Sequence, residues 1–132
     1  MKIILTGGAG LVGQNLIIKL KYKGYNNITV IDKHHSNVNI LRELHPDITI
    51  IDDDLGVNGQ WNSAFEGGDV VVMLQAQIGS NRSELFHQNN IISTYNVVDA
   101  MKSNFVPYLI HISSSVVESI SEDDYTETKK SQ

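Results

Sequence analysis

The chain of 132 residues has no cysteine, only two prolines and more acidic than basic residues. Without cysteine it can form no disulfide framework and carries no thiol chemistry. The net charge of −5, with no basic cluster interleaved with aromatic residues, argues against binding to nucleic acid. The longest apolar runs have only the length of a strand, so no membrane span is expected. The first residues also lack the apolar core of a signal peptide, which makes a cytoplasmic location the default expectation.

Strand and helix patterns alternate along the chain. Apolar strand patterns lie near residues 2–6, 28–32, 48–52, 70–74 and 108–113, and helical patterns lie near 11–23, 37–45, 59–66 and 84–103. This alternation predicts an α/β fold, a Rossmann-like doubly wound parallel sheet of about five strands in a single domain. The runs at 70–74 and 108–112 are nearly all apolar, as expected for strands that are covered on both faces.

A glycine-rich turn joins the first predicted strand to the first predicted helix. Its sequence is Thr6-Gly7-Gly8-Ala9-Gly10-Leu11-Val12-Gly13, which fits the dinucleotide-binding spacing Gly-x-Gly-x-x-Gly. Gly7 and Gly8 permit the tight turn, Gly10 lets the backbone approach a pyrophosphate, and Gly13 lets the helix lie close to the strand. The N–H groups of the helix N-terminus are then free to bind the anion. No Gly-Lys-Ser/Thr follows, so an ATP-binding P-loop is excluded.

An acidic residue stands where the second strand is expected to end. The helical pattern stops at Gly24, a natural helix C′ residue, and the strand at 28–32 ends in Asp32, about 20 residues after Gly13. The Asp32 carboxylate can accept both ribose hydroxyls of an adenosine and would repel a 2′-phosphate, which favours NAD over NADP. Lys33 follows directly and could soften that preference. In the alternative interpretation, Asp32 is an ordinary solvated strand end.

The long helix expected at 84–103 has two apolar sides. Ser83 is a candidate N-cap, and the doublets Ile91-Ile92 and Val97-Val98 face different directions around the helix. One side is expected to pack on the sheet. The other favours contact with a second subunit, so a dimer or higher oligomer through this helix is predicted.

Polar residues that could take part in catalysis lie near the end of the sequence. Ser113-Ser114-Ser115 follows the fifth strand, and Tyr125 and Lys129 lie four residues apart, on one face of a helix. The lysine charge favours phenolate over phenol, and a phenolate can take a proton from a substrate hydroxyl. Ser114 is the first choice to orient that hydroxyl, with Ser113 and Ser115 as alternatives. Alternatively, the serines form a turn and the tyrosine and lysine belong to a solvated end.

Two other groups of residues have simpler interpretations. The acidic trio Asp52-Asp53-Asp54 could suggest a metal site, but no second ligand cluster has suitable spacing, so no metal is predicted. His34-His35 is interpreted as a surface loop, and Trp61 and Phe65, four residues apart, as packing of a helix on the sheet.

Taken together, these motifs resemble those of the extended short-chain dehydrogenase/reductases, specifically the NAD-dependent sugar-nucleotide epimerases and dehydratases. The resemblance runs from Met1 to Gln132 and corresponds to the N-terminal part of such an enzyme. Its motifs are the glycine turn, Asp54-Leu55, Asp69 to Ala76, Asn89-Asn90 with Ser93-Thr94, the serine cluster, and Tyr125-Thr126-Glu127-Thr128-Lys129.

The resemblance implies NAD as the cofactor and a nucleotide sugar as the substrate. Catalysis would then use Tyr125 as base, Lys129 as its electrostatic partner and Ser114 to orient the hydroxyl, while hydride passes between the sugar and NAD. Asp54 would accept the exocyclic amine of adenine. The implied cofactor contacts are Gly7, Gly10, Leu11, Val12, Gly13, Asp32, Lys33, Asp54, Leu55, Leu74, Ala76, Asn89 and Lys129.

The chain also departs from the family pattern. Gln75 replaces an alanine beside the expected cofactor, where a long amide could crowd NAD or hydrogen-bond to it. The loop between the serines and Tyr125 is short, and the remaining strands and the C-terminal substrate lobe are absent from the sequence. The alternative to an enzyme is therefore a non-catalytic NAD-binding module, or a half-enzyme that needs a partner chain. In either case a large exposed apolar patch is expected, because nothing in the chain would cover the edge of the sheet.

Overall fold

The computed structural model describes residues 1–132 and contains one five-stranded parallel sheet. Its strands are β1 (Ile3–Thr6), β2 (Ile28–Asp32), β3 (Thr49–Asp52), β4 (Val70–Met73) and β5 (Tyr108–His111). The order across the sheet is β3-β2-β1-β4-β5, and every neighbouring pair is parallel. The chain therefore winds outward from β1 in both directions, and ligands of such sheets bind at the carboxyl ends of the strands near this reversal. The predicted fold class is confirmed.

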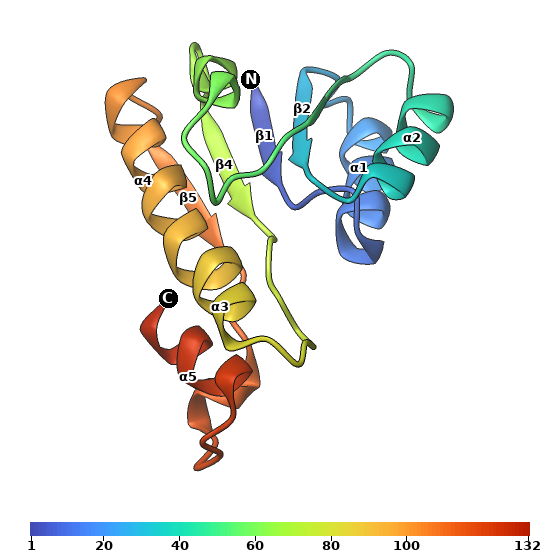
Figure 1. Ribbon diagram of the computed structural model, residues 1–132. Helices are drawn as coiled ribbons and strands as arrows, with labels where there is room; N and C mark the ends of the chain where they lie inside the picture. The colour runs from blue at the N-terminus through green and yellow to red at the C-terminus, as the bar shows by residue number, and fades with distance from the viewer.

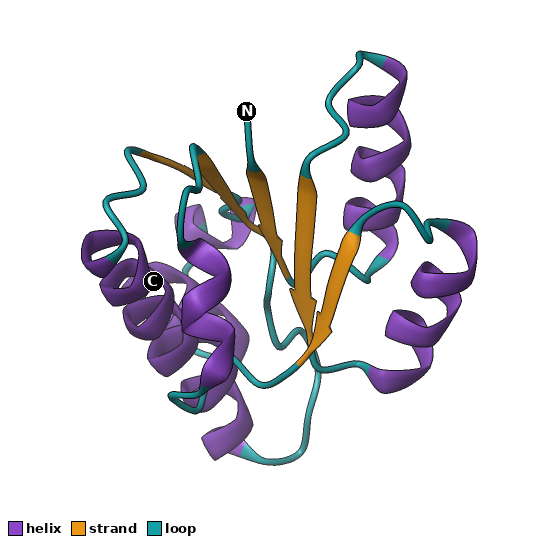
Figure 2. Cartoon of the chain, turned by 90° about the horizontal axis from the view of Figure 1, so that it is seen from above, coloured by secondary structure: helices purple, strands orange, loops and turns teal.

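Helices cover both faces of the sheet (Figure 2). They are α1 (Leu11–Tyr22), α2 (His35–Leu44), the 3₁₀ helix η1 (Gln60–Phe65), α3 (Ser83–Phe86), the π-helical turn η2 (His87–Ile92), α4 (Ser93–Ser103), the 3₁₀ turn η3 (Ser115–Glu118) and α5 (Asp124–Ser131). In Figure 1, α1 and α2 lie on one side of the strands and α3 and α4 on the other. No helix is both long and apolar enough to cross a membrane.

The alternation of side chains along the strands creates two separate cores. Ile3 and Leu5 of β1 belong to a cluster with Ile17 of α1 and Leu41 of α2. Ile4, between them in sequence, points to the opposite face, where Trp61, Phe65, Val97 and Met101 complete the second cluster. All four residues of β1 are buried, because this strand is central and covered on both faces. Trp61 and Phe65 therefore pack against the sheet, as the sequence predicted.

Three local predictions have distinct outcomes. Helix α1 ends as expected: Gly24 has φ +89°, its N–H bonds to the Lys21 carbonyl, and the Tyr25 N–H bonds to the Leu20 carbonyl. The predicted helix at 84–103 is a continuous helical path from Ser83 to Ser103, but its middle turn is π-helical. The prediction that Ser83 caps this helix is wrong, because the N-cap is Arg82 and the Ser83 hydroxyl donates to Asp124 at 2.7 Å instead.

The prediction that the fifth strand is covered on both faces is also wrong. Tyr108, Leu109 and Ile110 of β5 are 70%, 40% and 50% exposed. The strand lies at the edge of the sheet, paired only to β4, so its outer edge and much of both faces are open. Apolar residues in the sequence could not distinguish a covered strand from an uncovered one.

Candidate functional site

A cavity of about 690 Å³ opens at the carboxyl ends of the strands around β1. Its volume lies within the usual range for small-molecule sites. Every residue predicted to contact the cofactor lines it, except Lys129: the set is Gly7, Gly10, Leu11, Val12, Gly13, Asp32, Lys33, Asp54, Leu55, Leu74, Ala76 and Asn89. The fold thus brings together residues from the glycine turn, three strand ends and η2. Their role in binding remains a prediction.

The glycines of the turn serve different structural needs. Gly7 has φ +67°, and a β-carbon there would stand 2.5 Å from the Gln75 backbone. A β-carbon at Gly13 would stand 2.1 Å from the Gly8 carbonyl oxygen, so its close neighbour is the turn itself rather than the strand expected from the sequence. A β-carbon at Gly10 would have no neighbour nearer than the Gly7 carbonyl oxygen, at 3.9 Å. The protein's own packing therefore does not require glycine at position 10, where the chain borders the cavity.

The Asp32 carboxylate is held in place at the end of β2. Its Oδ2 accepts the Ala9 N–H and its Oδ1 accepts the His34 N–H, both at 2.9 Å. These bonds connect the glycine turn to the start of the segment that leads into α2. Each oxygen keeps a further lone pair, so the carboxylate is fixed at the cavity wall and can still accept hydroxyl donors. It is not a freely solvated strand end.

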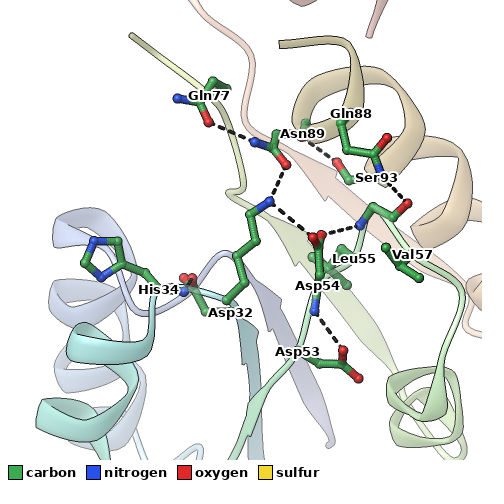
Figure 3. Close-up of polar contacts among 12 residues, drawn as sticks. Asp32, His34, Asp53, Asp54, Leu55, Val57, Gln77, Gln88, Asn89 and Ser93 are labelled. Atoms are coloured by element: carbon green, nitrogen blue, oxygen red, sulfur yellow. Dashed lines mark hydrogen bonds and ion pairs between the residues drawn. The ribbon is translucent and has the colours of Figure 1, made fainter. Parts of the chain in front are cut away.

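Lys33 bridges two walls of the cavity by bonding to Asp54 and Asn89, which are labelled in Figure 3. The Lys33 ammonium donates to Asn89 Oδ1 at 2.5 Å and to Asp54 Oδ2 at 3.3 Å. Asn89 in turn donates to Gln77 Oε1 at 2.8 Å, and Asp54 Oδ1 accepts the Gly56 N–H at 2.8 Å. The carboxylate predicted to meet adenine therefore already has a cationic partner.

Gln75, the departure from the family pattern, turns its side chain toward β1. Its Oε1 accepts the Thr6 hydroxyl, while its Nε2 is buried and has no acceptor. Gln75 also lines the cavity. A buried amide donor without a partner is costly, so an acceptor on a ligand or a small rotation of the amide would relieve it.

The three predicted catalytic residues lie outside this cavity, around α5. The Ser114 hydroxyl oxygen accepts the Val116 N–H at 3.3 Å and caps η3. Tyr125 is half-buried in the first turn of α5, and Lys129, one turn later, is buried. The Lys129 ammonium donates to the Ile112 carbonyl at 3.2 Å and to Gln132 Oε1, which anchors α5 to the end of β5. No hydrogen bond joins the Tyr125 hydroxyl to Ser114 or Lys129.

Burial controls the protonation of two groups in this region. Removal from water lowers the pKa of Lys129, because the charged form loses its solvation. Burial, followed by the positive charge of Lys129, lowers the pKa of His111 on β5. The Nδ1 atom of His111 is also buried without a hydrogen-bond partner.

The acidic trio at the end of β3 does not converge on one point. Asp52 pairs with His35 in the first turn of α2, Asp53 accepts the Asp54 N–H, and Asp54 pairs with Lys33. No group of three histidine or acidic side chains is placed to hold a metal ion. Both histidines are exposed, as predicted: His34 lies in the loop before α2, where it also lines the cavity, while His35 is the first residue of α2 rather than part of the loop.

The sequence analysis named Asn90 only as part of the Asn89-Asn90 motif and gave it no role at the site. This residue is fully buried, and its side chain bonds to the backbone of Gln77 on the cavity wall and to Thr128 on α5. The signal in the sequence was the polar pair Asn89-Asn90, directly before the apolar doublet Ile91-Ile92. Only the fold reveals what the second asparagine contacts.

Residues 3–131 match the family model described as NAD dependent epimerase/dehydratase family. The chain belongs to this family. Among curated members and relatives, a dTDP-D-glucose 4,6-dehydratase of Dictyostelium discoideum is 33% identical over an alignment of 132 residues, covering 88% of this chain and 29% of that protein. A 2-alkyl-3-oxoalkanoate reductase of Stenotrophomonas maltophilia is 29% identical, covering 89% of this chain and 34% of that protein.

Solved structures of epimerases from the family share the fold. The structure of a UDP-glucuronic acid 4-epimerase from Bacillus cereus in complex with NAD superposes with a TM-score of 0.84 at 27% identity, covering 99% of this chain and 50% of that one. The chain thus spans about a third of the curated relatives and half of this epimerase. Tyr108, Leu109 and Ile110 of β5 are exposed at the edge of the sheet, where the sequence predicted a large apolar patch.

Proposed function

We propose that this chain binds NAD in the cavity and forms the cofactor-binding part of a cytoplasmic enzyme that exchanges hydride with a nucleotide sugar. The observation that carries the proposal is the convergence of the glycine turn, Asp32 and Asp54 on one cavity at the strand ends. The open space at Gly10 adds to it, because that glycine has no packing role of its own.

The cavity residues fit the parts of a dinucleotide. The N-terminus of α1, at Gly10 to Gly13, has no side-chain cap and offers backbone N–H groups to a pyrophosphate. Asp32 would accept ribose hydroxyls and Asp54 the adenine amine. Leu11, Val12, Leu55, Leu74 and Ala76 supply apolar wall. Gln75 also lines the cavity, and because its Nε2 is buried and unpaired, a rotation of the amide would turn that donor toward a polar ligand.

The residues around α5 would move the proton. Bound NAD supplies the hydride acceptor and donor. Tyr125, as phenolate, takes the proton from the sugar hydroxyl, and Lys129, buried one turn away on α5, is its cationic partner. Ser114, at the carboxyl end of β5, orients the hydroxyl. Since Lys129 bonds to Ile112 and Gln132, α5 is already fixed against the strand end that carries the serine.

The proposed substrate is supported by the relatives, and the proposed partner by the exposed side of one helix. Relatives that act on nucleotide sugars include both a dehydratase and an epimerase, which supports a nucleotide sugar. The outer side of the helix from Ser83 to Ser103 presents Tyr95, 66% exposed, beside Ile91 and Val98. This surface supports a homodimer through that helix, which light scattering would detect, and a strictly monomeric chain would contradict it.

The test is a calorimetric titration of the purified chain with NAD and then NADP, beside an Asp32→Ala variant. NAD binding that is tighter than NADP binding and is lost in the variant is the expected result. Absence of NAD binding would contradict the proposal. NAD binding without any conversion of UDP- or dTDP-hexoses, even with the chain at high concentration, would restrict the role to cofactor binding or to half of a two-chain enzyme.

A further inference from the structure

We infer that Asn90 is a positioning residue that connects the cavity to α5, so that occupation of the cavity stabilises the helix carrying Tyr125 and Lys129. The inference rests on the proposed function, because it takes NAD as the occupant of the cavity. It concerns a residue with no predicted role of its own.

Asn90 uses both atoms of its amide to make this connection. Its Oδ1 accepts the Gln77 N–H at 2.7 Å, and its Nδ2 donates to the Gln77 carbonyl at 3.1 Å. The same Nδ2 also donates to the Thr128 hydroxyl at 2.9 Å. Asn90 therefore holds the backbone of the loop after β4 from both sides and contacts α5 at the residue before Lys129.

The connection continues to the adenosine end of the cavity. Gln77 lines the cavity, and its side chain accepts from Asn89 at 2.8 Å. Asn89 accepts from Lys33, which also bonds to Asp54. A path of hydrogen bonds thus runs from Asp54 through Lys33 and Asn89 to the side chain of Gln77, and from the Gln77 backbone through Asn90 to Thr128. A ligand that fixes Lys33 or Gln77 would restrict the motion of α5 through this path.

Asn90 is held in a fixed position because it is buried. The residue is 0% exposed, so losing any of its bonds would leave a polar atom unsatisfied in the interior. Helix α5 has only eight residues, so local opening of this helix is expected. Its other side-chain hydrogen bonds to the rest of the chain join the Ser83 hydroxyl to Asp124, the Lys129 ammonium to the end of β5, and the Gln132 amide at its C-cap to Thr94 of α4. None of these three bonds involves a residue that lines the cavity.

Hydrogen exchange with and without NAD tests the connection. Two variants interrupt the connection at different points. Thr128→Val removes the hydroxyl on α5 that accepts from Asn90 and leaves the bonds between Asn90 and Gln77. Asn90→Asp keeps the oxygen that accepts the Gln77 N–H but removes the amide N–H donor to the Gln77 carbonyl and to Thr128. Asn104→Ala is the matched control, because that amide bonds at the far end of α4 to Asn62 and Ala100. The readout is the change in α5 exchange caused by NAD, which a merely structural role of Asn90 would not alter.

In the unaltered chain and in Asn104→Ala, NAD is expected to slow exchange of the α5 amides by roughly tenfold. In Thr128→Val the slowing should fall below about twofold while NAD affinity changes by less than about threefold. Equal slowing of α5 in Thr128→Val and the unaltered chain would overturn the inference and leave the proposed function intact. Absence of NAD binding to the unaltered chain would overturn the proposed function, and the coupling with it.

Discussion

A β-carbon on Gly13 would stand 2.1 Å from the carbonyl oxygen of Gly8, well inside van der Waals contact. The first turn of α1 therefore presses directly on the backbone of the glycine turn. Relief of that overlap requires the helix or the turn to shift, because the atom in the way is backbone. The shape of the turn and the position of α1 thus depend on each other.

Gly13→Ala should lower the free energy of unfolding by about 2–3 kcal/mol, because the added methyl cannot be accommodated without moving backbone. Urea denaturation measures the change. Gly79→Ala is the control, since a β-carbon at Gly79 meets nothing within 4 Å and should leave stability nearly unchanged. Equal stability of the two variants would show that the glycine turn can shift to accommodate the added methyl group at little cost in free energy.

Lys33→Met should shift cofactor preference further toward NAD. The Lys33 ammonium, which pairs with Asp54, carries a positive charge beside Asp32 that would offset the repulsion between the Asp32 carboxylate and a 2′-phosphate. Its removal should raise the ratio of NAD to NADP affinity by about tenfold. Paired calorimetric titrations measure the ratio, and an unchanged or lower ratio would be evidence against this role.

Asp123 should make the start of α5 sensitive to acid. The Ser121 hydroxyl, followed by the N–H and hydroxyl of Thr126, lowers the pKa of Asp123 from 3.8 to about 2. A depressed pKa means that this carboxylate stabilises the folded helix above its ordinary pKa, and that the contribution disappears as pH falls from 3.8 through about 2. An NMR pH titration of the Thr126 amide should therefore show a midpoint near 2. A midpoint near 3.8 would contradict the cap, and Asp123→Asn should abolish the titration.

Lys129 should make stability rise with pH in the alkaline range. Burial lowers its pKa in the folded chain below the ordinary value of 10.5, so between the two values the unfolded chain binds more protons. The free energy of unfolding then gains a positive contribution as pH rises through the lowered pKa toward 10.5. Lys129→Met should remove that contribution, which urea denaturation at a series of pH values would measure by difference. The same slope in both chains would mean that the ammonium is fully solvated.

The fold could be predicted from the sequence because its signals are local. The ends of the five strands lie within two residues of the predicted ranges. Each strand is a short apolar run between residues that interrupt it, such as Gly24 and Asp32, and such a run can be recognised from residues that are close together in the sequence. The predicted cofactor residues also gather in one cavity, because parallel strands place their carboxyl ends at the same edge. The exposure of β5 could not be predicted, since it depends on what lies beside the strand.

The polar contacts of the site depend on distance in space rather than sequence. Lys33 meets Asn89 across 56 positions, and Asn90 meets Thr128 across 38. Nothing in the periodicity of the helix indicated the π-helical turn that contains both asparagines. The capping role given to Ser83 was wrong for a similar reason, because Asp124, 41 residues away, competes for its hydroxyl.

The most direct test of NAD binding by the glycine turn is a calorimetric titration of Gly10→Ala. Gly10 has φ −75° and ψ 179°, which alanine adopts without strain, and the new β-carbon has open space around it. The folded chain should therefore lose less than about 1 kcal/mol of stability, measured by urea denaturation. If the pyrophosphate lies against Gly10, the variant should remain folded and lose NAD binding. A folded variant that binds NAD with unchanged affinity would show that the cofactor does not lie on this turn.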